Sequence, residues 1–462
     1  MTLIKSISGI RGTIGGTVNE GLTPIDTVKF ASAYGTWLKN KNPNKRLKVV
    51  IGRDARPSGQ MVSDLVCSSL IGLGIDVVNL GLSTTPTVEI AVPLENADGG
   101  IILTASHNPK QWNALKFLNH KGEFISKSDG EELLSYIESG KLEYESVDKL
   151  GQYSTKEGSI SAHIDAILAL DTVDSDLVHS KKMKVVVDCI NSTGAISIPP
   201  LLDALGVDYV LLNAEITGDF AHNPEPLPAN LVDLCSAVVS EKADFGIAVD
   251  PDVDRLALVS DDGSLFGEEY TLVAVADYLL SKKAGNTVSN LSSTRALSDI
   301  TKKYGGDYFA SAVGEVNVVE MMKAKNAVIG GEGNGGIIYP GLHYGRDALV
   351  GIAFILSLLA ERSMSLSELR ASYPDYYISK NKIDLDASLD LDSIFKALRD
   401  KFSNESLNEI DGLKIDFEEG WVHLRKSNTE PIIRVYSESK SEEKSKDLAM
   451  QVIDIVKLIQ NS

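Results

Sequence analysis

The sequence has little of several residue types, and each shortage excludes a class of protein. Its 462 residues include only three cysteines, Cys67, Cys189 and Cys235, too few for a disulfide framework and typical of reduced core thiols. Positive charge is also scarce, since 45 lysines and arginines face 64 aspartates and glutamates and give a net charge of −19. Because nucleic-acid-binding proteins need clustered positive charge, this balance argues against a nucleic-acid partner.

Long hydrophobic runs are missing as well. The longest apolar segment, residues 348–360, is about a dozen residues long, whereas a membrane-spanning helix needs about 20. Residues 1–7 lack the apolar stretch of a secretory signal peptide. We therefore expect a cytoplasmic protein with no membrane partner.

The order strand, helix, strand occurs three times along the chain. The three copies cover residues 47–80, 183–212 and 287–309, and connections of this length join parallel strands. After Pro374 short strands alternate with two helices, a pattern typical of an α+β domain with a mostly antiparallel sheet. We expect three related doubly wound α/β domains at residues 1–150, 151–257 and 258–372, and a C-terminal α+β domain at residues 373–462.

A serine follows the apolar strand predicted for residues 100–103. Ser106 lies in the stretch Thr104-Ala-Ser-His-Asn-Pro109, with His107 beside it and Lys116 ten residues further on. Loops at the carboxyl ends of strands in open α/β sheets carry ligand sites, and a serine needs an activating neighbour to act as a nucleophile. A plain strand-end turn is the competing interpretation.

Three aspartates alternate directly after another apolar strand, residues 245–249. Asp250, Asp252 and Asp254 are followed by Arg255. Three carboxylates that converge on one point suit a hard cation such as Mg²⁺, whose coordination a phosphate group can complete. Without a cation, the three carboxylates would raise one another's pKa. An ordinary acidic turn is the alternative, and an EF-hand fits poorly because Arg255 stands where its glycine belongs.

Two further loops suit a sugar phosphate. The glycine-rich stretch 330–336 carries Glu332 and Asn334, and no helix start follows it, so it fails the context of a dinucleotide-binding loop and suits sugar hydroxyls instead. A plain connecting loop is its competing interpretation. Near the C-terminus, a guanidinium, hydroxyls, an amide and backbone N–H groups predict an anion-binding nest. Its candidate ligands are Arg425, Ser427, Asn428, Thr429 and Arg434.

Together these motifs resemble the α-D-phosphohexomutases, a family that includes phosphoglucomutase, phosphomannomutase and phosphoglucosamine mutase. Residues 104–109 resemble the family's phosphoserine loop, 250–255 its metal loop, 331–336 its sugar-specificity loop and 425–431 its phosphate-binding loop. The resemblance covers the whole chain. It implies three doubly wound domains and a smaller C-terminal domain around a central cleft.

The resemblance also implies a reaction. Ser106, phosphorylated at rest, would bind Mg²⁺ together with the three aspartates and pass its phosphoryl group to a hexose phosphate substrate. The resulting hexose 1,6-bisphosphate, which also serves as an activator, would turn over and return its other phosphate to the serine. Lys116 is the expected proton-transfer group, and His107 and Arg11 support the site. The implied substrate ligands are Arg255, Glu332, Asn334, Arg425, Ser427, Asn428, Thr429 and Arg434.

Two departures from the family pattern bear on the substrate. Gly336 stands where many members have a histidine, which leaves a second acid/base group unassigned, with His343 as a candidate. The sugar loop and Tyr344-Gly-Arg-Asp347 resemble an archaeal-type branch. This resemblance favours conversion of glucosamine 6-phosphate to glucosamine 1-phosphate, which supplies UDP-N-acetylglucosamine and cell-wall precursors.

Several alternatives stay open. Mannose and glucose phosphates are the other candidate substrates. Two hypotheses of a different class are a Mg-dependent phosphatase with Asp250 as its nucleophile and a non-catalytic sugar-phosphate-binding protein. We expect a monomer or a homodimer.

Overall fold

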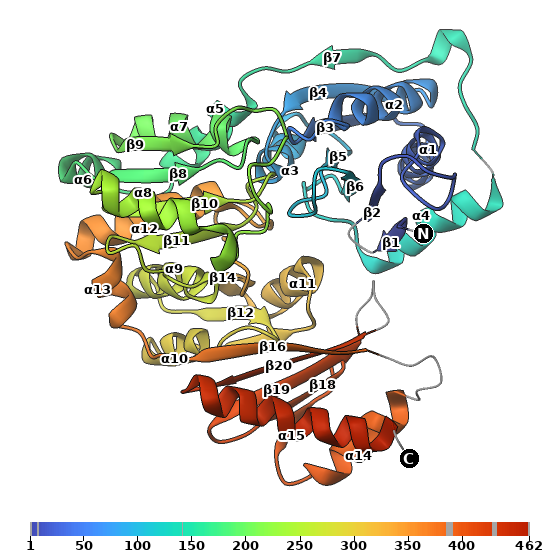
Figure 1. Ribbon diagram of the computed structural model, residues 1–462. Helices are drawn as coiled ribbons and strands as arrows, with labels where there is room; N and C mark the ends of the chain where they lie inside the picture. Colours follow the sequence, from blue (N-terminus) through green and yellow to red (C-terminus); the bar gives the residue numbers. More distant parts are fainter. Residues whose placement is uncertain (1, 7–8, 141, 385–390, 427–431, 461–462) are drawn as a thin grey trace.

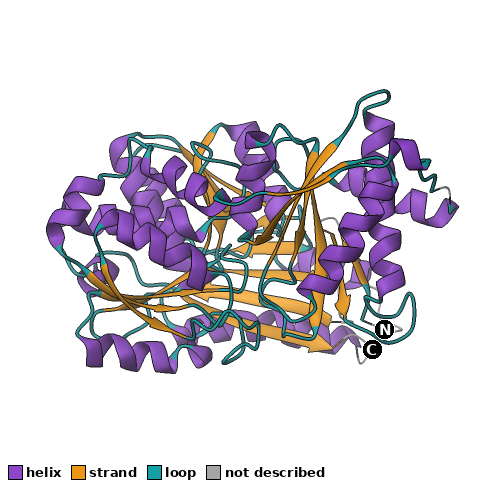
Figure 2. Ribbon diagram, turned by 90° about the horizontal axis from the view of Figure 1, so that it is seen from above, coloured by secondary structure: helices purple, strands orange, loops and turns teal. Residues whose placement is uncertain are grey.

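The computed structural model describes residues 2–6, 9–140, 142–384, 391–426 and 432–460. Within them, four β-sheets follow one another along the chain, from the blue N-terminal domain to the red C-terminal domain (Figure 1). Helices flank the strands over most of the molecule (Figure 2). No helix in these ranges is both long and apolar enough to cross a membrane.

The first domain has a mixed sheet with helices on both faces. In the order in which they pair, its strands are β1 (Ile4–Ser6), β2 (Gly9–Thr13), β6 (Trp112–Leu118), β5 (Gly99–Leu103), β3 (Lys48–Arg53), β4 (Asp76–Leu82) and β7 (Tyr153–Thr155). Its helices are α1 (Pro24–Lys41), α2 (Gly59–Gly72), α3 (Thr85–Leu94), α4 (Lys127–Ser139) and the 3₁₀ turn η1 (Val147–Lys149). The predicted parallel pairing of β3 with β4 is confirmed.

The alternation of side chains along β3 explains the two layers of helices. Val49 and Ile51 point into a core that α1, α2 and α4 share, whereas Val50 points into a separate core under α3. All three side chains are fully buried. A strand that is apolar on both faces must be covered on both, which is why its sequence reads as a continuous apolar run.

The second and third domains repeat the α/β arrangement with smaller sheets. The second sheet contains β11 (Leu256–Ser260), β10 (Phe245–Val249), β8 (Lys184–Asp188) and β9 (Asp208–Leu212). Its helices are α5 (Ser159–Leu168), α6 (Ser175–Lys181), α7 (Gly194–Leu205), α8 (Val232–Glu241) and the 3₁₀ turn η2 (Pro228–Asn230). The third sheet contains β13 (Tyr308–Ser311), β12 (Asn286–Asn290), β14 (Ala327–Glu332) and β15 (Gly336–Ile338). Its helices are α9 (Glu268–Lys282), α10 (Ala296–Lys303), α11 (Glu315–Lys325), α12 (Ala348–Arg362) and α13 (Leu366–Ala371).

Helix α12 joins the second and third domains into one hydrophobic core. Residues 348–360 are all buried, and the core cluster that contains most of them also includes residues of β8, β10 and α9. A helix that is apolar on every side belongs inside a core when it is too short for a membrane. The apolar segment singled out in the sequence is therefore a buried helix.

The fourth domain is an antiparallel sheet covered by two helices. Its strands are β16 (Tyr377–Asp384), β20 (Ile432–Ser439), β19 (Gly420–Lys426), β18 (Leu413–Asp416) and β17 (Ser406–Asn408), and its helices are α14 (Leu391–Lys401) and α15 (Glu442–Gln460). The predicted antiparallel pairing is confirmed. The loop after β12 contacts this sheet, because Ser292 Oγ lies 2.9 Å from His423 Nδ1 and Arg295 N donates to Glu438.

Two strands extend past the boundaries predicted from the sequence. β7 adds to the first sheet by pairing with β4, although it begins after residue 150. β11 pairs along its whole length with β10 and runs past residue 257. We therefore propose that the first domain ends after Thr155 and the second after Ser260.

Candidate active site

Ser106 lies in a loop held in an uncommon backbone conformation. The serine loop (residues 104–109) follows β5, and Ser106 has a φ of +47°, in the left-handed region. A non-glycine residue there costs about 1–3 kcal/mol, so neighbouring contacts must fix it. One such contact is the hydrogen bond of 2.9 Å from Ser106 N to Thr104 Oγ1. Ser106 as a whole is only 8% exposed.

A buried arginine fixes the serine loop through hydrogen bonds to its backbone carbonyls. Arg56 follows β3, and its guanidinium donates to the carbonyl oxygens of Ser106 at 2.8 Å, Pro109 at 3.2 Å and Trp112 at 2.5 Å. Its Nε donates to Asp54 at 2.7 Å, and Asp54 also accepts from Thr104 Oγ1 at 2.6 Å. The planar fork of one side chain therefore satisfies several carbonyls of the loop at once.

The three aspartates and Ser106 meet, although the serine comes from the first domain and the aspartates from the second. Ser106 Oγ donates to Asp250 Oδ2 at 2.6 Å. Asp250 Oδ1 accepts from the backbone N–H groups of Asp254 and Arg255, both at 3.2 Å, so it closes the turn after β10 (the aspartate loop, residues 250–255). Burial, followed by the charges of Asp254 and Asp252, raises the pKa of Asp250 well above its ordinary value.

Two cations balance the aspartate loop. Lys116 Nζ, on β6, donates to Asp252 Oδ2 at 2.8 Å and lies 3.6 Å from Asp254. Burial alone would lower the pKa of Lys116, but the two carboxylates outweigh it and raise that pKa. Arg346 Nη2 donates to Asp254 at 2.6 Å. Lys116, a sequence-predicted site residue, is therefore an ammonium group on the aspartate cluster.

The aspartate loop fits a divalent cation. Carboxylate oxygens of Asp250, Asp252 and Asp254 lie within 4.8 Å of one another. Asp252 Oδ1 and Asp254 Oδ1 are buried and accept no hydrogen bond from the described residues. Buried carboxylate oxygens that accept no hydrogen bond are stabilised by a bound cation. A set of ligands made only of oxygen atoms suits a hard cation.

Arginines from the first, second and fourth domains form a positive region beside this loop. Burial, then the charges of Arg255 and Arg434, lower the pKa of Arg11. The Nε groups of Arg11, Arg255 and Arg425 are buried and donate no hydrogen bond to the described residues. These donors suit an anion such as phosphate. Ser427, Asn428 and Thr429, predicted for the same anion, lie outside the described residues.

The glycine-rich stretch is a tight hairpin between β14 and β15. Glu332 pairs with Gly336 across a three-residue turn. The Glu332 carboxylate is buried and accepts from Asn290 at 3.0 Å, Gly314 N at 3.1 Å and Arg346 at 3.1 Å. Asn334 accepts from Gly336 N within the turn and is partly exposed. Glu332 is thus tied to the aspartate loop through Arg346.

The structure gives a physical reason for the glycine at position 336. A Cβ atom there would lie 2.4 Å from Cδ of Arg346, so the arginine fills the space that a side chain would need. A substitution of Arg346 would itself be disruptive, because its guanidinium bonds Glu315 at 3.0 Å as well as Asp254 and Glu332. Arg346 was noted in the sequence only within Tyr344-Gly-Arg-Asp347, without a role, and Glu315 was not identified.

The two histidines considered from sequence have different surroundings. His107 Nδ1 lies 3.3 Å from Ser106 Oγ, and burial together with the charge of Arg255 lowers its pKa well below the ordinary value. His343 instead contacts Asp347 and Glu89, each at 3.2 Å. The structure thus brings His107 to the serine and pairs His343 with carboxylates outside the aspartate loop.

Family models match the four parts of the chain in order. The models of phosphoglucomutase/phosphomannomutase match with their alpha/beta/alpha domain I at residues 3–143, domain II at 161–263 and domain III at 267–377, and with their C-terminal domain at 383–455. The chain belongs to the phosphoglucomutase/phosphomannomutase family. The resemblance noted in the sequence is confirmed.

Relatives of this family match over nearly their full length. A phosphoglucomutase/phosphomannomutase of Thermococcus kodakarensis is 36% identical over 445 residues, which cover 94% of this chain and 96% of the relative. A phosphoglucosamine/phosphogalactosamine mutase of Sulfurisphaera tokodaii is 33% identical over 457 residues, covering 97% and 98%. The crystal structure of a family member from Burkholderia thailandensis superposes with a TM-score of 0.84 at 25% identity and covers 98% of both chains.

Proposed function

We propose that this chain is a phosphohexomutase that interconverts hexose 6-phosphate and hexose 1-phosphate through a phosphorylated Ser106 and a bisphosphorylated sugar. The hydrogen bond of 2.6 Å between Ser106 Oγ and Asp250 carries the proposal, because it joins a hydroxyl of one domain to a carboxylate cluster of another. The chain's family membership supports the same reaction. Phosphoryl transfer needs such positioning and charge neutralisation more than it needs covalent chemistry by the protein.

The first transfer moves a phosphoryl group from Ser106 to a sugar hydroxyl. The bond from Oγ to phosphorus breaks, the sugar oxygen forms the new bond, and a proton passes from the sugar hydroxyl to Oγ. We assign this proton transfer to Lys116, the ammonium group on the same carboxylate cluster: it would donate a proton to the departing Oγ, and the resulting amine would accept the proton of the sugar hydroxyl. Mg²⁺ held by Asp250, Asp252 and Asp254 would supply charge neutralisation for the phosphoryl group. The second transfer reverses these steps with the other phosphate of the bisphosphate.

The arginine region would hold the phosphate that does not react. Arg11, Arg255, Arg425 and Arg434 come from three domains, and the Nε groups of the first three donate no hydrogen bond within the part of the chain that the structure describes. A phosphate bound there leaves the rest of the sugar to turn, so either phosphate can face Ser106. Glu332 and Asn334 would contact the sugar hydroxyls, and Arg346 would keep Glu332 in place.

Glucosamine phosphate is the substrate that we propose, with mannose and glucose phosphates as alternatives. The archaeal-type sugar loop and Tyr344-Gly-Arg-Asp347 support this choice. The Sulfurisphaera relative carries a phosphoglucosamine name, and the Thermococcus relative carries a phosphoglucomutase/phosphomannomutase name at similar identity. We further propose a cytoplasmic monomer or homodimer with hexose 1,6-bisphosphate as its activator.

Turnover assays test this proposal directly. Glucosamine, mannose and glucose 6-phosphates are compared with Mg²⁺ and the matching bisphosphate, and the highest kcat/KM is expected for glucosamine 6-phosphate. Ser106→Ala should abolish turnover, and phosphate should be found on the peptide that contains Ser106. Turnover by Ser106→Ala at the unchanged rate would contradict the assignment.

The same experiment separates the rival functions. A phosphatase with Asp250 as nucleophile would carry a hydroxylamine-labile acyl phosphate and would release inorganic phosphate. A binding protein would retain the sugar phosphate without converting it. Asp250 accepts a hydrogen bond from Ser106, which favours its role beside the serine over attack on substrate.

A further inference from the structure

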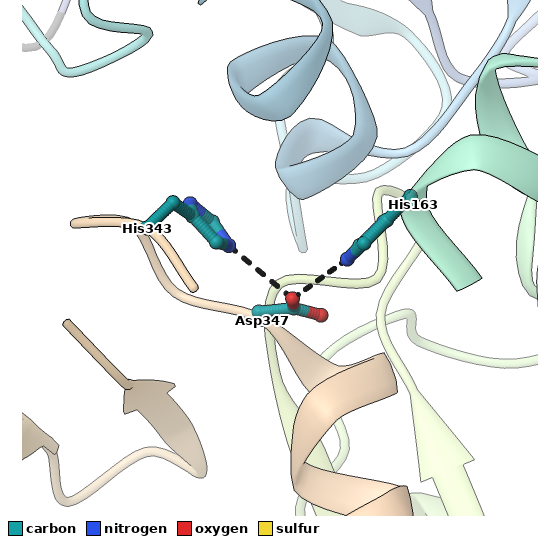
Figure 3. Close-up of side chains that lie close together, drawn as sticks. All are labelled: His163, His343 and Asp347. Atoms are coloured by element: carbon teal, nitrogen blue, oxygen red, sulfur yellow. Dashed lines mark hydrogen bonds and ion pairs between the residues drawn. The ribbon is translucent and has the colours of Figure 1, made fainter. Parts of the chain in front are cut away.

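A second cluster of metal-type ligands lies outside the aspartate loop. His163 on α5, Asp347 before α12 and His343 in the loop that precedes it come together from the second and third domains (Figure 3). One ligand atom of each lies within 4.8 Å of the others. His163 and Asp347 are fully buried, and the His343 side chain is 10% exposed.

The distances from Asp347 to the two imidazole nitrogens are close to those between ligands of one small metal ion. The Nε2 atoms of His163 and His343 both approach Oδ2 of Asp347, at 2.9 Å and 3.2 Å (Figure 3). Ligands bound at about 2.0–2.1 Å in tetrahedral geometry lie about 3.3 Å apart. The three atoms could therefore bind a common ion with small shifts, and one coordination position would remain for water.

The outer nitrogens of both imidazoles have partners of the kind that metal-binding histidines use. His163 Nδ1 lies 3.0 Å from Thr87 Oγ1, and His343 Nδ1 lies 3.2 Å from the carboxylate of Glu89. Both partners are on α3 of the first domain. Such partners orient the ring and leave the inner nitrogen for the metal. Asp347 is fixed too, because Oδ1 accepts from the first N–H groups of α12.

Glu89 provides an independent reason to expect a cation. Its residue is 1% exposed, and neither carboxylate oxygen accepts a hydrogen bond in the part of the chain that the structure describes. His343 Nδ1 lies 3.2 Å from this carboxylate, and a buried carboxylate is costly unless a positive charge lies close to it. The carboxyl groups of Glu89 and Asp347 both face the imidazole of His343, so a cation bound between the rings would lie close to both.

We propose that His163, His343 and Asp347 bind a divalent transition metal ion of the Zn²⁺ class, with Glu89 and Thr87 as outer partners. Imidazole nitrogen selects such ions, whereas the aspartate loop offers only oxygen and suits Mg²⁺. The ion would join the three α/β domains at one point. Thr85 on the same helix α3 donates to Asp252 at 2.6 Å, so the site adjoins the aspartate loop without sharing a ligand.

Metal counting on the full-length protein tests this proposal. The chelator-treated protein is equilibrated with Zn²⁺ or Co²⁺ in the presence of excess Mg²⁺, which occupies the aspartate loop, and bound metal is measured by mass spectrometry. We expect about one Zn²⁺ per chain, and Co²⁺ with the visible absorption of nitrogen-containing four- or five-coordinate sites. If the protein retains no Zn²⁺, the proposal is overturned, and a protonated His343 balances the carboxylates instead.

Three variants locate the ion. His343 lies in a loop, and the variant His343→Asn should retain no Zn²⁺ and show no Co²⁺ absorption. The variant Glu89→Gln should bind Zn²⁺ about 10–100-fold more weakly. The matched control is His222→Asn, which removes a histidine paired with Asp188 at 2.9 Å outside the cluster and should leave binding unchanged. Binding that persists in His343→Asn would assign the ion elsewhere and overturn the proposal. The wild-type measurement decides the question even if a variant fails to fold.

Discussion

Replacing Arg56 with lysine should slow the reaction far more than it weakens substrate binding. The guanidinium donates to three carbonyl oxygens of the segment that contains Ser106, and one of these bonds is to Ser106 itself. Lysine keeps a positive charge near Asp54 but has no planar fork, so it cannot replace these bonds together. The left-handed Ser106 would then be free to relax toward the commoner conformations.

The expected magnitudes follow from these contacts. Loss of charge-assisted hydrogen bonds of a buried group lowers the free energy of unfolding by about 1.5–3 kcal/mol. A misplacement of the nucleophile by about 1 Å lowers kcat by about 100-fold, because reactivity depends on alignment with the reacting atom. KM should change little, since Arg56 is 1% exposed and its fork is occupied by the loop.

The assay compares Arg56→Lys with a matched control. Arg46 also forms a two-pronged pair, with Asp76 at 2.8 Å and 2.6 Å, but on the surface and far from Ser106. Arg46→Lys should leave kcat and the unfolding midpoint unchanged. If Arg56→Lys remains folded and its kcat equals that of the unchanged enzyme, the idea that this fork aligns the serine is refuted.

Three further predictions concern charged groups. Asp252→Asn should abolish Mg²⁺-dependent turnover, and full activity of the unchanged enzyme in EDTA would speak against the metal role. Arg346→Lys should lower kcat about 100-fold, since lysine cannot contact three carboxylates at once; the measurement is steady-state turnover. Burial raises the pKa of Asp277, but its contacts with Arg362 and other partners outweigh burial, so this pKa is lowered in the folded state. The ionised Asp277 therefore stabilises the fold above its unfolded pKa, and this stabilisation is lost as the pH falls through the folded pKa. Asp277→Asn should therefore cost about 1.5–3 kcal/mol of unfolding free energy at pH 7 and less below about pH 4, measured by denaturant titration.

The elements that the sequence predicted well are those set by local patterns. The pattern of strand, helix and strand located β3, β8 and β12 within a few residues, and in β3 and β8 burial on both faces leaves a continuous apolar run. The serine and aspartate loops were found for a related reason: each follows such a strand, where ligand sites form. Their meeting at Asp250 could only be expected from the family resemblance, since 144 positions separate it from Ser106.

The residues that the sequence did not reveal are partners rather than motifs. Nothing in the sequence around Arg56 distinguishes an arginine that bonds loop carbonyls from one that faces solvent, and the stretch that contains Arg346 does not indicate which carboxylates this arginine bonds. His163 and Asp347 are 184 positions apart and become a pair only because α12 packs between the second and third domains.

The position of Gly336 explains why partners matter for the site as much as motifs. Considered alone, a glycine at this point of the sugar loop is a missing acid/base group. In the folded chain its absent side chain leaves room for Arg346, which links Asp254 of the aspartate loop to Glu332 of the hairpin. A larger residue at 336 would push the arginine away from both carboxylates and leave them buried without it. The glycine and the arginine therefore have to change together, and a substitution at either position alone should disturb both loops.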